Sequence, residues 1–284
     1  MLTDTAQTLP PQPRKPFRLG DMRWGSERRW FWFTILIFAL GIFVFTTISL
    51  GTLFVILLGV FALAWFLMRL LHAGMLGSAV KVTSAQMPSL AKLFEECARR
   101  VQPPLVQGFV AQSPLLNAYA FGFSSPQAIV LYSGLVEHLD EDELRFVIGH
   151  EMGHVAFGHT RVNSTIGGLA GVPGIPFISE IISVAFLAWS RCAEFSSDRA
   201  GLIACGRLDK AQSAMVKLMI GPKLASMISV AELEKQADDL SFNPLGWLGQ
   251  LGQRHPFSVF RLREQRKFAE SEAYRNTIES LEEI

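Results

Sequence analysis

The sequence predicts an α+β protein in which a mainly helical domain with a small antiparallel β-sheet follows an N-terminal transmembrane helical hairpin. Three observations support this fold class: a 38-residue apolar run from Phe31 to Met68, three short β-rich segments between residues 105 and 132, and a capped helix that begins after Asp140. Half of the 284 residues are hydrophobic and 18% are charged, whereas about 25% are charged in ordinary soluble domains. The excess of apolar residues therefore needs a membrane location.

Net charge and cysteine content exclude two classes of site. The net charge of +1 gives no general basic surface, so we expect no nucleic-acid partner. The three cysteines, Cys97, Cys192 and Cys205, are scattered and form no Cys-X-X-Cys pair. Such a set does not build a disulfide framework or a cysteine zinc site. We expect free thiols in a reducing compartment.

Residues 1–29 are expected to form a flexible basic arm with little apolar periodicity. Prolines recur between Pro10 and Pro16. Because proline lacks the backbone N–H and restricts the residue before it, this stretch cannot be helical.

Residues 30–71 are expected to form two transmembrane helices. The run from Phe31 to Met68 contains no charged residue. One helix of that length would extend about 57 Å, against about 30 Å of hydrocarbon, so two short spans fit better. The predicted turn lies between Thr46 and Gly51, where small and polar residues interrupt the run. A cleaved signal peptide fits poorly, because the run is too long and no small-residue cleavage pattern follows it.

Basic residues on both sides of the apolar run predict its orientation. Arg69 and Lys81 follow the run. Six basic residues precede it: Arg14, Lys15, Arg18, Arg23, Arg28 and Arg29. Under the positive-inside rule both ends face the cytoplasm. We therefore expect a multi-pass protein of the cell inner (plasma) membrane whose domain, residues 80–284, faces the cytoplasm; the cationic flanks oppose the reversed topology.

The domain is expected to begin with a short helix and three strands. Residues 89–100 form an amphipathic pattern that ends at Pro103-Pro104. Residues 105–111, 117–123 and 128–132 have the composition of strands, and Pro114 and Pro126 lie in the breaks between them.

A second helix carries the strongest chemical signal in the chain. Asp140 and Glu143 are spaced as a capping box, and Leu139 and Leu144 are placed to form the accompanying hydrophobic staple. The helix then continues through the sequence His-Glu-Met-Gly-His of residues 150–154.

The spacing of this motif predicts a metal site. His150 and His154 are four residues apart, so both side chains lie on one helix face and can bind one ion together. Glu151 lies beside that ion, where it can take a proton from a metal-bound water. A purely structural zinc site would gain nothing from such a base.

A catalytic zinc needs a third protein ligand. Glu194 and Glu180 are the candidates, and Glu194 is favoured because Asp198 lies four residues further on the same helix face, where it can orient a zinc-bound imidazole. An ordinary ion pair with a neighbouring arginine is the alternative role for Asp198. A histidine ligand of the metzincin type would need residue 160, which is Thr160, so we expect His159 to be a surface residue or a supporting one.

In these motifs the chain resembles the HtpX-like membrane-bound zinc metallopeptidases, which are gluzincins related to the CAAX prenyl proteases. The resemblance covers roughly residues 80–205 and a short C-terminal motif. It depends on five pieces in order: Asn117-Ala118-Tyr119-Ala120, Ser133-Gly134-Leu135, His150 to His154, Glu194 with Asp198, and His255-Pro256 with Arg261.

The resemblance implies a zincin-type metallopeptidase domain and a role for each site residue. His150, His154 and Glu194 would bind one Zn²⁺ per chain, Glu151 would be the general base, and Asp198 would support the ligands. The family pattern further places three residues around the substrate: Asn117 on an edge strand beside the cleft, and His255 and Arg261 at the oxyanion and the metal ligands.

The implied activity is that of a membrane-anchored zinc endopeptidase that acts on polypeptides, either membrane or misfolded proteins, next to a lipid bilayer. A zinc-containing membrane scaffold or chaperone-like protein without turnover is the alternative. The chain departs from the HtpX pattern between residues 166 and 189, where glycines, prolines and Glu180 interrupt the apolar residues. We expect a loop and a helix there rather than further spans, and a solvated amphipathic helix in the charged tail, residues 261–284.

Overall fold

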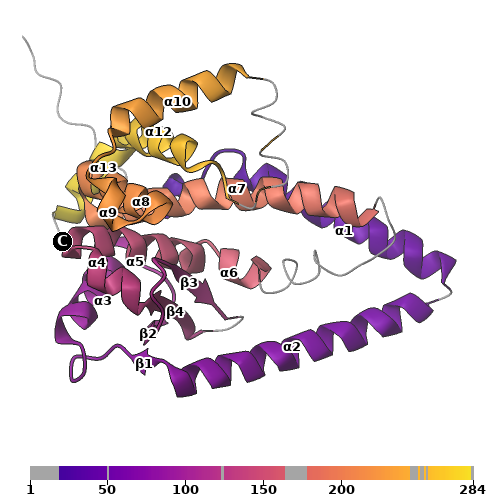
Figure 1. Cartoon of the computed structure of the whole chain (residues 1–284). Helices are drawn as coiled ribbons and strands as arrows, with labels where there is room; N and C mark the ends of the chain where they lie inside the picture. Colours follow the sequence, from indigo (N-terminus) through magenta and orange to yellow (C-terminus); the bar gives the residue numbers. More distant parts are fainter. Residues whose placement is uncertain are drawn as a thin grey trace, which may run out of the picture.

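The structure, a computed structural model, describes residues 19–49, 51–122, 125–163, 178–243, 249, 253 and 255–282 (Figure 1). Helices dominate these residues, and a small sheet lies against them. The helical elements are η1 Leu19–Met22, α1 Glu27–Ile48, α2 Thr52–Ser78, α3 Pro88–Val101, α4 Ser133–His138, α5 Glu141–Ala156, α6 His159–Val162, α7 Ile178–Cys205, α8 Leu208–Ile220, α9 Pro222–Ala225, α10 Val230–Phe242, α12 Ser258–Ala269 and α13 Glu272–Glu282.

Helices α1 and α2 form a long arm that turns back at its far end (Figure 1). The turn lies where the sequence predicts it, and Gly51 adopts a left-handed φ of 87° there, which glycine accepts without strain. Among the described residues, α1 alone is both long and apolar enough to cross a membrane. The apolar part of α2, Phe54–Leu67, is shorter, so the second span remains a prediction.

The sheet has four strands in the order β1-β2-β4-β3. Their bounds are β1 Val80–Lys81, β2 Val106–Ala111, β3 Ala118–Phe121 and β4 Gln127–Tyr132. β1 pairs antiparallel with β2, and β3 pairs antiparallel with β4. The central pair, β2 and β4, is parallel, with Val106 opposite Gln127 and Ala111 opposite Tyr132. The prediction of an antiparallel sheet was therefore wrong, because the sheet is mixed.

The composition of β4 explains this topology. Its residues Gln127 to Leu131 are all buried, as expected for a strand that is covered on both faces. Such a strand belongs in the centre of a sheet. β4 therefore lies between β2 and β3, which leaves β3 at the edge and places β4 parallel to β2.

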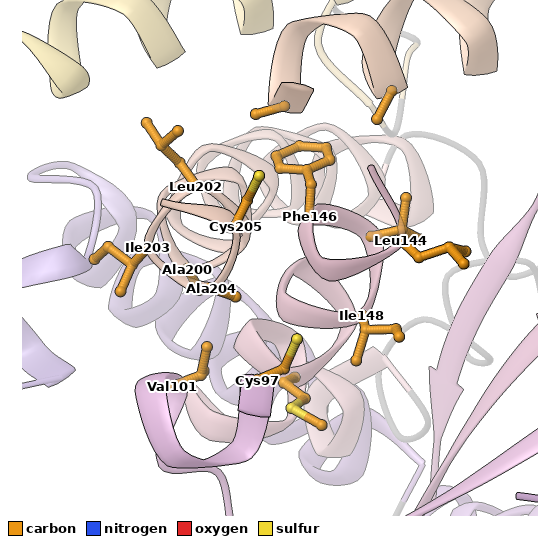
Figure 2. Packing of buried hydrophobic residues seen from close by; sticks show 14 of the residues in the cluster. Cys97, Val101, Leu144, Phe146, Ile148, Ala200, Leu202, Ile203, Ala204 and Cys205 are labelled. Atoms are coloured by element: carbon orange, nitrogen blue, oxygen red, sulfur yellow. The ribbon is translucent and has the colours of Figure 1, made fainter. Parts of the chain in front are cut away.

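The hydrophobic core surrounds α5, which packs between α3 and α7. Figure 2 shows Phe146 and Ile148 of α5 in one buried cluster with Leu202 of α7 and with Cys97 and Val101 of α3. All five side chains are at most 1% exposed. Through this core the two helices that carry the predicted metal ligands are held side by side.

Small residues allow α5 and α7 to approach very closely. A Cβ atom on Gly149 would lie 2.2 Å from the Cβ of Ala204, and one on Gly153 would lie 2.7 Å from the Cβ of Ala200. Gly201 of α7 is equally confined, because its Cβ would lie 2.7 Å from a backbone oxygen of α5. The two α5 glycines directly precede His150 and His154 in the sequence, so the close contact lies next to the ligands.

The segment that precedes the arm also packs onto α7. Met22 of η1 is 1% exposed, and Trp24 stacks on Phe195 with ring centroids 4.6 Å apart. The guanidinium of Arg199 lies over the Trp24 ring at 4.8 Å. Residues 19–29, which the sequence places in a flexible arm, therefore lie against the domain, whereas residues 1–18 are outside the described residues.

The C-terminal helices complete the body over α7 and α8 (Figure 1). The tail forms two helices, α12 and α13, rather than one, and Leu262 and Phe268 of α12 are buried in the core. The expected helix before residue 189 is the first part of α7, where Phe186 and Trp189 are buried. The loop expected before it, and residues 164–177 in general, lie outside the described residues.

Candidate metal centre

Helix α5 begins with the capping box that the sequence predicts. The Asp140 carboxylate accepts a hydrogen bond from the Glu143 N–H at 3.0 Å, and the Asp140 N–H donates to the Glu143 carboxylate at 2.8 Å. Both bonds satisfy N–H groups that the first helical turn leaves without partners. The start of the helix, and with it the direction of the following histidines, is thus fixed locally.

Three predicted ligands meet where α5 faces α7. The Nε2 atoms of His150 and His154 are 3.1 Å apart. The Glu194 carboxylate lies 3.6 Å from the Nε2 of His150 and 3.4 Å from that of His154. These three residues form a group that could hold a metal ion.

The donor separations fit a tetrahedral zinc site. Zinc bonds to nitrogen and oxygen of about 2.0–2.2 Å give tetrahedral edges of roughly 3.3–3.6 Å between ligand atoms. The three observed separations, 3.1, 3.4 and 3.6 Å, cluster around that length. Two imidazole nitrogens with one carboxylate are also the ligand set that zinc accepts when a fourth position is left for water.

Asp198 fixes the orientation of the His150 ring. Its carboxylate lies 3.0 Å from the Nδ1 of His150, so Nδ1 carries the proton and Nε2 keeps a lone pair for a metal. The Arg261 guanidinium donates two hydrogen bonds to the same carboxylate, from Nε at 2.8 Å and from Nη2 at 2.6 Å. Asp198 therefore pairs with Arg261, which is distant from it in the sequence, as well as with His150.

The third ligand candidate, Glu194, is held as a carboxylate. Burial alone would raise its pKa, but the charge of Arg261, at 3.3 Å, and hydrogen bonds from His154 and His255 hold the pKa of Glu194 well below its usual range. The Nδ1 of His255 is 3.1 Å from the Glu194 carboxylate, and the His255 side chain is 67% exposed. Glu194 is thus negatively charged at neutral pH and ready to bind a cation.

Arg261 of α12 lies between two acidic side chains. Burial would lower its pKa, but the carboxylates of Asp198 and Glu194 raise it, so that the guanidinium stays charged. For Asp198, burial alone would raise the pKa, but Arg261 and His150 lower it below its usual range. Such a buried network depends on every member, because removal of one charge leaves another without a partner.

Glu151 lies next to the ligands without joining them. Its side chain is on the same helix, and the residue is 8% exposed. Within the described part of the chain, no group donates a hydrogen bond to its carboxylate. A buried acceptor without a protein partner normally faces a water or a ligand.

Asn117 precedes the edge strand β3 and is exposed. Its side-chain oxygen accepts a hydrogen bond from the Ala118 N–H at 3.0 Å, and its backbone oxygen accepts one from Tyr132 at 3.0 Å. In the described residues β3 is an edge strand of the sheet and pairs with β4.

His159 is neither on the surface nor a metal ligand. It is 1% exposed, and its Nδ1 lies 3.1 Å from the Nδ1 of His154. Its Nε2 lies 3.1 Å from the carboxylate of Glu27. Burial lowers the pKa of His159 to about 4, so the ring is neutral. No signal in the sequence indicated that Glu27 reaches the site. The side chain of Glu180, the alternative third ligand, lies outside the described residues.

A helix with two histidines and a glutamate, completed by a carboxylate from a second helix, defines the glutamate-ligand class of zincin metallopeptidases. The sequence matches the family described as Peptidase family M48 over residues 84–269. The chain belongs to this family of metallopeptidases, and the resemblance to HtpX-like proteins is confirmed.

Curated relatives agree with this assignment. The chain is 31% identical to the "Plastoglobule-localized metallopeptidase 48, chloroplastic" of Arabidopsis thaliana, over 72% of this chain and 63% of that protein. It is 29% identical to a "Protease HtpX homolog" of Streptococcus pyogenes, over 62% of this chain and 60% of the homologue. The chain thus spans about 60% of the length of these relatives.

Among solved structures, the chain matches the crystal structure of S. mikatae Ste24p. The TM-score is 0.48 and the sequence identity is 19%, over 80% of this chain and 61% of that one.

Proposed function

We propose that this chain is a membrane-anchored, zinc-dependent endopeptidase. The observation that carries the proposal is the group formed by His150, His154 and Glu194, with donor atoms 3.1–3.6 Å apart, on the helix that also carries Glu151. Membership of a metallopeptidase family supports the same activity. His150, His154 and Glu194 would hold one Zn²⁺ per chain.

Zinc at this site would polarise the scissile carbonyl and acidify a water molecule. The residues of the chain perform the proton transfers. Glu151 takes the proton of the attacking water and passes it to the nitrogen of the leaving amine. Asp198 keeps the ring of His150 in the tautomer that binds the metal.

His255 and Arg261 would act on the developing negative charge in different ways. The exposed His255 side chain reaches the ligand carboxylate from the solvent side, and we propose it as a hydrogen-bond donor to the oxyanion. Arg261 is occupied by Asp198 and Glu194, so it orients the ligands and adds positive charge to the site.

Polypeptide substrates would bind as an extended strand along the edge strand β3, near Asn117, by β-augmentation. Asn117→Ala should then raise KM and change kcat little, because the lost contact is made in both ground and transition states. The proposed substrates are membrane or misfolded proteins. That choice fails if purified enzyme cleaves soluble unfolded chains but leaves a matched membrane-embedded sequence intact.

The proposed location is the cell inner (plasma) membrane, with α1 and α2 spanning it and the catalytic domain in the cytoplasm. Apolar side chains on both helices are exposed, among them Leu36 at 65%, Phe43 at 67% and Val55 at 69%. Such surfaces belong in lipid. A reporter fused after residue 284 should be active in the form that functions in the cytoplasm; activity only in the exported form would reverse the topology.

Glu151→Gln tests the enzymatic proposal directly in the detergent-purified full chain. The amide keeps the size of the side chain but cannot take a proton, so zinc content should remain near one per chain while casein cleavage falls by about 10²–10⁴-fold. Glu141→Gln is the matched control, since Glu141 lies in the first turn of the same helix with an exposed side chain. Unchanged cleavage by Glu151→Gln would favour the scaffold without turnover.

A further inference from the structure

A buried carboxylate lies at the start of α1, where the chain enters the arm. Glu27 is 1% exposed, and Arg23, four residues before it, forms an ion pair with it. The hydroxyl of Ser196 on α7 donates a second hydrogen bond. The third partner is the Nε2 of His159, 3.1 Å from the Glu27 carboxylate. A role of Glu27 in anchoring the chain would not by itself require this contact.

His159 connects this carboxylate to a candidate metal ligand. Its other ring nitrogen, Nδ1, lies 3.1 Å from the Nδ1 of His154. His159 is 1% exposed, the His154 side chain is 11% exposed, and the centroids of the two rings are 5.2 Å apart. Glu27, His159 and His154 therefore form one continuous series of contacts that ends at the metal group.

One arrangement of protons satisfies every contact in the series. If the Nε2 of His154 binds a metal, its Nδ1 carries the proton and donates it in a hydrogen bond to the Nδ1 of His159. That nitrogen must then be the acceptor, so the Nε2 of His159 carries a proton and donates to Glu27. A carboxylate at the end of the series favours this tautomer of both rings.

The two histidines of the motif are thus supported in parallel ways. The ring of His150 meets a carboxylate directly, that of Asp198, and Arg261 neutralises it. The ring of His154 meets a carboxylate through His159, and Arg23 neutralises it.

We propose that Glu27 and His159 are positioning residues that hold the metal ligand His154 in its binding tautomer and orientation. The proposal rests on the zinc site of the proposed function. It implies that the start of the membrane arm supports the metal site, although Glu27 and His159 are 132 positions apart in sequence. A domain that began at residue 80 would lack this support.

The structure also offers a purely architectural role for Glu27, which the test must separate from positioning. Ser196 bonds to both Glu27 and the Trp24 N–H, the latter at 2.8 Å, so these contacts help dock the N-terminal segment on α7. Ser196 has no contact with His154 among those described. Ser196→Ala therefore loosens the docking and removes one donor to Glu27, but it keeps the Glu27–His159 and His159–His154 contacts.

The experiment measures Zn²⁺ affinity of the detergent-purified full chain by chelator competition, for the wild type, Glu27→Gln, His159→Phe, the double variant and Ser196→Ala. Removal of such supporting partners weakens zinc binding by about 10–100-fold. We expect losses of that size for both single variants. Because the two residues act in series, the double variant should lose no more than His159→Phe alone. Ser196→Ala should lower the melting temperature but keep zinc affinity within about threefold.

Cobalt supplies a second readout that docking alone does not change. The visible absorption of Co²⁺ at this site should shift in Glu27→Gln, since the ring of His154 changes its orientation or basicity, and should keep its wild-type form in Ser196→Ala. Wild-type zinc affinity and cobalt spectra in Glu27→Gln and His159→Phe would overturn the proposal, as would fully multiplicative losses in the double variant. Failure of the wild type itself to bind zinc would instead overturn the proposed function.

Discussion

Gly149→Ala should separate the two helices that build the metal site. The added Cβ would lie 2.2 Å from the Cβ of Ala204, 3.1 Å from the Cα of Gly201 and 3.3 Å from the carbonyl oxygen of Ala200. Carbon atoms in contact are about 3.5–4.0 Å apart, so the helices must move apart by roughly 1.5 Å. None of these neighbours is a flexible side chain that can turn away.

This shift affects both the stability of the core and the binding of a metal. Overpacking of a core costs about 1–3 kcal/mol, and the better helix propensity of alanine returns at most about 1 kcal/mol. The more sensitive quantity is metal binding, because metal sites tolerate about 0.2 Å of error in ligand distance. Glu194 on α7 would move away from His150 on α5 by several times that amount, so zinc content should fall sharply.

The reciprocal variant Gly149→Ala/Ala204→Gly is the matched control. It moves a single methyl group from α7 to α5, so the closest clash disappears and the helix propensities of the two changes cancel. Urea unfolding and zinc content of the detergent-purified proteins should show loss in Gly149→Ala and recovery of most of it in the pair. A single variant with wild-type zinc content and stability, or a pair that is worse than the single variant, would refute the reasoning.

Three further predictions concern the cap of α5, the burial of Met22 and the ion pair of Asp198. Asp140→Ala removes the cap of α5 and should lower the free energy of unfolding by about 1 kcal/mol in urea titrations; an unchanged midpoint would contradict a role of the cap in stability. Met22→Ala should cost about 2–5 kcal/mol because the side chain is buried, whereas Leu105→Ala, at 67% exposure, should cost less than about 0.5 kcal/mol; equal small effects would show that η1 is not part of the core. Because Arg261 and His150 hold the pKa of Asp198 below its unfolded value of about 3.9, the stability that they contribute is present above that pH and is lost as the pH falls through the folded pKa. Arg261→Met should weaken this pH dependence in the metal-free chain, and an identical pH profile would contradict the ion pair.

Local signals in the sequence predicted the most important helix well. The capping box of Asp140 and Glu143 and the i, i+4 spacing of His150 and His154 involve neighbours within one or two turns. Helix geometry alone then determines where these groups point. The turn near Gly51 was predicted for a similar reason, because it depends on a short interruption in an apolar run.

Local signals in the sequence did not predict the order of the strands in the sheet. Three of the four strands in the described sheet were predicted to within two residues, and β1 was not predicted. The order of the strands depends on which strand is covered on both faces. The uninterrupted apolar stretch Ala128 to Leu131 of β4 carried that information. The antiparallel prediction followed the order of the strands in the chain rather than this difference in burial.

Contacts between distant segments were predicted only in part. The sequence predicted that Glu194 joins His150 and His154, whereas the close approach of α5 and α7 at Gly149 and Gly153 was not predicted. No sequence pattern predicts the contact between Glu27 and His159. A single glutamate at the start of an apolar helix looks like any other charged residue that flanks such a helix. Only the packing of η1 and α1 on α7 brings that carboxylate to the metal group.

Zinc content of Glu194→Gln beside Glu180→Gln tests the central claim, a metal site formed by His150, His154 and Glu194, most directly. Both glutamates belong to α7, so the two variants make the same chemical change in the same helix. The full-length protein would be purified in detergent, and bound metal measured by elemental analysis. The account predicts about one zinc per chain in the wild type and in Glu180→Gln, and loss of zinc in Glu194→Gln. Retention of zinc in Glu194→Gln together with its loss in Glu180→Gln would contradict the account.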